Sequence, residues 1–165
     1  MGYGFHFRCG KCNYSFNASL DVGMLFPLTY EETVKAGREG KLGDDIRDFL
    51  EKHPDGALDV SGAAYKCSKC GNLASDKVLT MYLPKAPEAR QEKEKGCWSV
   101  GFTGDGIDYV APWELKTDHK FYRIHPHYCK ECGSRMRKLS EKELKAGLWC
   151  PHCGERMEQG GYDWD

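Results

Sequence analysis

Eight of the nine cysteines in this 165-residue sequence occur as four Cys-x-x-Cys pairs. The pairs are Cys9/Cys12, Cys67/Cys70, Cys129/Cys132 and Cys150/Cys153, and Cys97 stands outside them. A two-residue spacing lets both thiolates of a tight turn face one cation, and two such turns supply the four ligands of a tetrahedral site. The sequence therefore predicts two metal sites made of cysteine, and this constrains the fold more than any other feature.

The residue after each pair supports metal ligation. Glycine follows three of the second cysteines, at Gly71, Gly133 and Gly154, and Asn13 follows the fourth. Glycine and asparagine accept the positive φ that lets backbone N–H groups face the sulfurs. A disulfide framework would not predict this repeated residue choice.

The distances along the chain suggest how the pairs combine. Between Cys132 and Cys150 lie 17 residues, within the roughly 15–20 expected for a zinc site made of two Cys-x-x-Cys pairs. Between Cys12 and Cys67 lie 54 residues, which indicates an inserted subdomain, because the cost of closing a loop grows slowly with its length. A cross-braced arrangement, in which the first and third pairs share a metal, stays open.

The residues around each pair carry a resemblance to a known family. They are Phe7-Arg8-Cys9-Gly10-Lys11-Cys12-Asn13-Tyr14, Tyr65-Lys66-Cys67-Ser68-Lys69-Cys70-Gly71, Tyr128-Cys129-Lys130-Glu131-Cys132-Gly133 and Trp149-Cys150-Pro151-His152-Cys153-Gly154. These stretches resemble the knuckles of the zinc-ribbon, or rubredoxin-like, superfamily. The resemblance implies β-hairpins around two four-cysteine sites, one holding Cys9, Cys12, Cys67 and Cys70 and the other Cys129, Cys132, Cys150 and Cys153. Proteins of this superfamily serve several unrelated functions, so the resemblance does not select one.

The expected fold is a small metal-stabilised α+β structure with two zinc-ribbon β-hairpin units. Residues 1–83 are expected to form the first ribbon, with a helical insertion at about 27–54. Residues 84–96 are charged and lack large apolar side chains, which favours a linker. Residues 97–165 are expected to form a β-hairpin followed by the C-terminal ribbon.

Local patterns predict individual elements. Alternating aromatic residues at 3–7 indicate a half-buried strand. Thr29-x-x-Glu32 and Ser140-x-x-Glu143 have the spacing of helix capping boxes, and the pattern over 44–52 predicts another helix, with Pro54 beyond its end. Gly104-Asp105-Gly106 indicates the turn of a hairpin.

The ligand type bears on metal and function. Four thiolates suit zinc or a single iron, and zinc is the commoner occupant of a closed four-cysteine site. A closed site has no position for a reactive water, so we expect two structural zinc ions in a non-catalytic protein-interaction module with an unidentified protein partner. A rubredoxin-like iron redox protein is one alternative.

A second alternative is a nucleic-acid-associated zinc ribbon. The net charge of -1 excludes a globally basic surface, but residues 116–149 carry 9 basic and 4 acidic side chains. The candidate contacts near Tyr128 and Trp149 are Lys130, Arg135, Arg137, Lys138, Lys142 and Lys145. Solvated side chains are the simpler interpretation of this group.

Other chemistry has weaker support. The residues around Cys97 match no nucleophile motif, which favours a buried thiol. A third metal site could be built from His125 and His127 with His119, His152 and Asp118, but ordinary surface residues are the favoured interpretation.

The start of the sequence shows neither a basic n-region nor an apolar h-region, and no apolar run approaches the ~20 residues of a membrane span. We therefore expect a cytoplasmic protein without a membrane partner. A reducing compartment of this kind favours metal ligation over disulfides.

Overall fold

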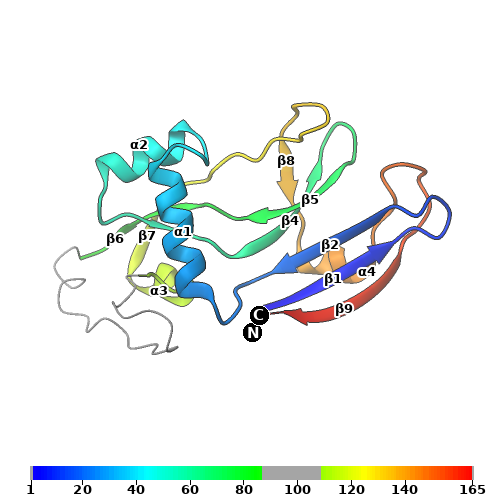
Figure 1. Ribbon diagram of the computed structural model, residues 1–165, viewed down its shortest axis with the longest axis horizontal. Coiled ribbons are helices and arrows are strands. Elements are labelled where there is room, and N and C mark those ends of the chain that lie inside the picture. The colour runs from blue at the N-terminus through cyan, green and yellow to red at the C-terminus, as the bar shows by residue number, and fades with distance from the viewer. Residues whose placement is uncertain (1, 87–108, 165) are drawn as a thin grey trace. The chain divides into compact units, whose positions relative to one another are not determined.

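The computed structural model describes residues 2–86 and 109–164 (Figure 1). It is a small α+β structure with several antiparallel sheets. The elements are β1 (Gly2–Arg8), β2 (Ser15–Leu20), α1 (Phe26–Arg38), α2 (Asp44–Lys52), β3 (Ala57–Leu58), β4 (Gly62–Cys67), β5 (Leu73–Lys77), β6 (Met81–Pro84), α3 (Pro112–Thr117), β7 (His119–Arg123), β8 (Met136–Lys138), α4 (Glu141–Ala146) and β9 (Glu158–Trp164).

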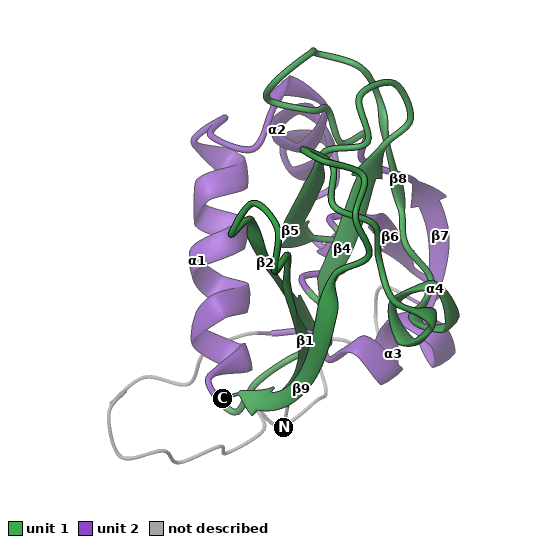
Figure 2. Ribbon diagram, turned by 90° about the vertical axis from the view of Figure 1, so that its right-hand side faces the viewer, with its two compact units in different colours: residues 1–24, 61–78, 126–165 green, residues 25–60, 79–125 purple. Residues whose placement is uncertain are grey.

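Two compact units divide the chain, and neither is one continuous stretch of sequence (Figure 2). Unit 1 consists of Met1–Met24, Ser61–Val78 and Pro126–Asp165, and unit 2 of Leu25–Val60 and Leu79–His125. These units differ from the consecutive division into 1–83 and 97–165 that the sequence suggested. The reason is strand pairing within unit 1, which joins segments that are far apart along the chain.

Unit 1 contains two three-stranded antiparallel sheets, ordered β2-β1-β9 and β5-β4-β8. In the first sheet Phe7 lies opposite Phe16 on β2 and Gln159 on β9. In the second, Cys67 lies opposite Met136 on β8. Each sheet therefore places a cysteine-bearing turn from early in the chain beside one from late in the chain.

The core of unit 1 follows from the alternation along β1. Phe5 and Phe7 are buried while His6 and Arg8 between and after them are exposed, which confirms the predicted half-buried strand. The Phe7 side chain is fully buried, and its ring stacks against Phe16 with centroids 6.1 Å apart. The same cluster contains residues of β4, α4 and the segment before β9, so one core serves both sheets.

Replacing Phe7 by alanine is expected to destabilise unit 1 by about 3–5 kcal/mol, because the change removes a fully buried ring and leaves a cavity. Urea unfolding, followed by tryptophan fluorescence, measures the change. Tyr128→Ala is the matched control, because Tyr128 is 60% exposed and its loss should cost about 0.5 kcal/mol or less. Equal losses for both variants would contradict this assignment of the core.

Unit 2 contains α1, α2, α3 and the antiparallel sheet β3-β6-β7. The helix predicted at Asp44–Lys52 is confirmed as α2, which buries Ile46, Phe49 and Leu50. The helix predicted from Thr29 begins earlier, at Phe26, so the capping-box interpretation of Thr29 was wrong. Pro27 explains the earlier start, because proline is favoured in the first helical turn, where its missing N–H costs nothing.

Some predicted features lie outside the described residues. They are Cys97, the hairpin turn at Gly104-Asp105-Gly106 and most of the expected linker at 84–96. Among the described helices, none combines the length and the apolar character that crossing a bilayer requires.

Candidate metal centres

All eight paired cysteines gather into two groups within unit 1. Site 1 consists of Cys9, Cys12, Cys150 and Cys153, and site 2 of Cys67, Cys70, Cys129 and Cys132. In each group the four sulfur atoms lie within 4.8 Å of one another. Each group could therefore bind a metal ion.

This pairing corrects the one expected from the sequence. The first pair of cysteines combines with the fourth and the second with the third, which we call the nested pairing. The expected consecutive pairing, of the first pair with the second and the third with the fourth, is wrong, and so is the cross-braced arrangement. The cause is the register of the strands beside the turns: Arg8 lies opposite Glu158 on β9, and Cys67 lies opposite Met136 on β8. The spacing argument compared distances along the chain and contained no information on strand partners.

The four cysteine-bearing turns share one backbone design, and it matches the predicted residue choice. At site 1, the Cys9 N–H donates to the Tyr14 carbonyl at 2.8 Å, and the Asn13 N–H donates to the Cys9 carbonyl at 3.0 Å. Asn13 has a φ of 59° and Gly154, in the partner turn, a φ of 74°. Gly71 and Gly133 repeat this conformation at site 2, with φ of 76° and 67°. The predicted positive φ is confirmed in all four turns.

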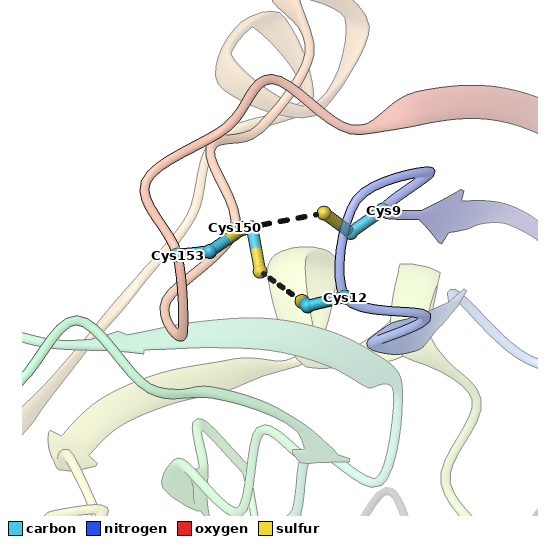
Figure 3. A group of neighbouring side chains, drawn as sticks. All are labelled: Cys9, Cys12, Cys150 and Cys153. Carbon is cyan, nitrogen blue, oxygen red and sulfur yellow. Dashed lines mark hydrogen bonds between the residues drawn. The ribbon is translucent and has the colours of Figure 1, made fainter.

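At site 1 the four side chains point toward a common centre (Figure 3). The Cys9 and Cys153 sulfurs are 3.5 Å apart, and so are those of Cys12 and Cys150. Zinc bound tetrahedrally at about 2.3 Å from each sulfur places neighbouring sulfurs about 3.8 Å apart. The residues present therefore fit a four-coordinate metal ion of the size of zinc with small adjustments.

Site 2 has the same dimensions and clearer hydrogen bonding to sulfur. The sulfur of Cys70 lies 3.6 Å from that of Cys129 and 3.5 Å from that of Cys132. The backbone N–H groups of Lys69 and Cys70 both donate to the Cys67 sulfur at 3.4 Å. Such donors stabilise a thiolate and orient it as a ligand.

Backbone and side-chain donors lower the pKa of some ligands. Hydrogen bonds from the backbone N–H of Cys12 and then of Lys11 lower the pKa of Cys9 to about 7, against burial that raises it. Hydrogen bonds from the side chain and backbone of Ser134 lower the pKa of Cys132 to about 6. These two sulfurs are prepared to act as thiolate ligands near neutral pH.

Neighbouring sulfurs raise the pKa of other ligands. The Tyr14 N–H lowers the pKa of Cys12, but the Cys150 sulfur and burial outweigh it and raise the pKa to about 12. At site 2 the Asn72 N–H lowers the pKa of Cys70. The Cys67 sulfur, burial and the other two sulfurs outweigh it and raise the pKa to about 12. Four thiolates in so small a volume repel one another, so full ionisation requires a cation at the centre.

Burial divides each pair in the same way. The first cysteines, Cys9, Cys67, Cys129 and Cys150, are all buried and belong to the apolar clusters of unit 1. The second cysteines are exposed or intermediate. Each site thus lies at the end of an apolar cluster and closes it toward solvent.

The six basic residues proposed as nucleic-acid contacts lie in different environments. Arg137 pairs with Glu143 at 2.7 Å, and Lys145 pairs with Glu141 at 2.6 Å. Lys138 follows Arg137 on β8, Lys142 lies on α4, and Lys130 and Arg135 lie at the third cysteine turn. Lys66 on β4 lies opposite Arg137 and was missed, because only the sheet register brings it there.

The histidines form no third ligand group within residues 2–86 and 109–164. His125 pairs with Asp45 at 2.9 Å, and His119 contacts the Glu114 carbonyl at 3.2 Å. His152 packs on Tyr14 beside site 1, with ring centroids 4.5 Å apart. The expectation of surface residues was wrong for His119, which is buried, and the side chains of His125 and His127 are only 15% and 9% exposed.

Comparison with protein-family models, with curated proteins and with solved structures found no significant match to this chain.

Proposed function

We propose that this chain is a non-catalytic protein with two structural zinc ions that works as an interaction module. The observation that carries the proposal is the closed set of four sulfurs in each site. Four protein ligands complete a tetrahedral shell and leave no position for a reactive water or a substrate. The sites are therefore suited to holding the fold together rather than to catalysis.

Zinc is the preferred occupant because it is the usual metal of closed four-cysteine sites, and the sulfur spacing of both groups is compatible with it. Each turn also holds a basic or imidazole side chain between its cysteines: Lys11, Lys69, Lys130 and His152. Four thiolates outnumber the two charges of a divalent ion, so the occupied site is anionic and nearby cations offset its charge.

A protein partner stays a prediction, and exposed apolar side chains on unit 2 are candidate contacts for it. Trp113, Phe121 and Ile124 are each more than half exposed. Contiguous apolar patches mark surfaces that bind another protein, so these side chains are the positions at which to look for such a surface.

Elemental analysis of native protein tests the zinc proposal directly. We expect two zinc ions per chain and a colourless solution, because zinc has a filled d shell. A red protein with thiolate-to-iron absorption would establish the iron alternative. One metal ion or none per chain would contradict the two-site proposal.

A further inference from the structure

Strands β4 and β8 present two different faces. On one face Tyr65, Cys67 and Met136 pack into the apolar cluster beside site 2. On the other, Ala64 and Leu139 belong to the main core of unit 1. Side chains two residues apart along a strand point to the same face. Lys66 therefore shares the face of Ala64, and Arg137 and Arg135 share the face of Leu139. We call Lys66, Arg135 and Arg137 the basic strand face.

The basic strand face places like charges side by side. Lys66 lies directly opposite Arg137 in the antiparallel register, and Arg135 is two residues before Arg137 along the same extended segment. Like charges directly opposite each other destabilise a sheet, so such a pair needs a counter-charge. Glu143 supplies one for Arg137 at 2.7 Å.

The two other cations of this face have no such neighbour. Within residues 2–86 and 109–164, neither Lys66 nor Arg135 has an ion-pair partner. Along the chain, the nearest acidic residue to Arg135 is Glu131, in the turn of site 2, and the nearest to Lys66 is Asp59. The face therefore keeps a positive charge that an external anion can neutralise.

An exposed aromatic ring lies beside these cations. Tyr128 forms an antiparallel bridge with Arg135 and is 60% exposed. A flat ring next to a guanidinium is a surface on which an unpaired base can stack while its phosphates meet the cations. An acidic peptide would use the charges but would not need the ring.

The fourth cysteine turn provides an internal comparison. Trp149 and Arg156 form the same bridge there, and Trp149 is 58% exposed. Arg156, however, donates to the carbonyl of Ala146 at the end of α4. The arginine has a structural contact in that turn, whereas the Arg135 guanidinium is available for a ligand.

We infer that the basic strand face and Tyr128 bind single-stranded nucleic acid, with phosphates at the cations and one base stacked on the tyrosine ring. This inference goes beyond the proposed function but rests on it in one respect: site 2 holds together the turns that carry Tyr128 and Arg135. Duplexes are disfavoured, because their paired bases cannot stack on a side chain.

The test is fluorescence anisotropy of a labelled oligothymidylate of about 15 nucleotides with the zinc-loaded full chain. Each phosphate contact with a single strand contributes about -0.7 to the slope of log K against log salt, so the two unpaired cations should give a slope of about -1.4. Arg135→Ala should reduce its magnitude by about 0.7. Tyr128→Ala should weaken binding about 5-fold or more and leave the slope unchanged.

Lys138→Ala is the matched control. It removes one positive charge from the same extended segment, but Lys138 lies opposite Tyr65 on the other face of the sheet. Binding by this variant should stay within about 2-fold of the parent, because its charge is farther from the bound strand. An equal loss in Lys138→Ala and Arg135→Ala would overturn the assignment of the face.

Further outcomes separate this inference from the proposed function. Zinc content is measured on every sample. Two zinc ions per chain with no oligonucleotide binding at low salt would overturn the inference and leave the proposed function standing. Competition by polyglutamate as strong as by oligothymidylate would also overturn it and would identify an acidic polypeptide as the ligand class.

Discussion

Replacing Cys12 and Cys153 together by serine is expected to remove one zinc ion per chain and leave the other in place. Both residues belong to site 1, so site 2 keeps its four sulfurs. Consecutive pairing would place the two cysteines in different sites, and the same variant would then lose both ions. Zinc content per chain, measured by elemental analysis after desalting, distinguishes the two arrangements.

The reciprocal variant makes the result decisive. Cys12→Ser combined with Cys70→Ser damages both observed sites and should remove both ions, although consecutive pairing predicts the loss of only one. The two variants carry the same number and type of substitutions. If the first lost both zinc ions and the second lost one, the nested pairing would be wrong.

Removal of zinc by a strong chelator is expected to unfold unit 1. Structural zinc contributes about 10–16 kcal/mol of apparent binding free energy in small zinc-finger peptides. Whole domains are stable by only about 5–15 kcal/mol, so losing two such contributions leaves too little to hold unit 1 folded. Near-ultraviolet circular dichroism should lose its aromatic signal on chelation.

Restoring the metal provides the control for chelation. Zinc added back should recover the signal, whereas magnesium should not, because magnesium prefers oxygen ligands in octahedral geometry. An unchanged spectrum after complete zinc removal would contradict a structural role for the sites, and the Phe7 cluster alone would then hold unit 1 together.

Features determined by a few neighbouring residues were predictable from the sequence. The capping box at Ser140 is confirmed: the Ser140 hydroxyl accepts from the Glu143 N–H, and the Glu143 carboxylate accepts from the Ser140 N–H. Arg137, and after it Ser140, lower the pKa of Glu143 to about 2. The helix at Asp44–Lys52 was predictable for the same reason, since its apolar spacing is local.

Strand β9 was not predictable, and the pairing of the sites depends on it. Gly160 and Gly161 at its centre are residues that strands usually avoid. They pair with His6 and Phe5 on β1, while the ring of Tyr162 lies where a side chain on Gly4 would otherwise be. The contacts that stabilise β9 come from β1, and no pattern within β9 itself reveals its partner.

The nested pairing also sets the order in which ligands become available during synthesis. Cys9 precedes its site 1 partner Cys153 by 144 residues, which corresponds to about 7–30 s at about 5–20 residues per second. Cys67 precedes Cys132 by only 65 residues. Cys67 and Cys70 leave the ribosome before Cys150 and Cys153, the site 1 partners of Cys9 and Cys12, have been made. The first four-cysteine group that the nascent chain can form is therefore the consecutive pairing, which the finished protein does not contain.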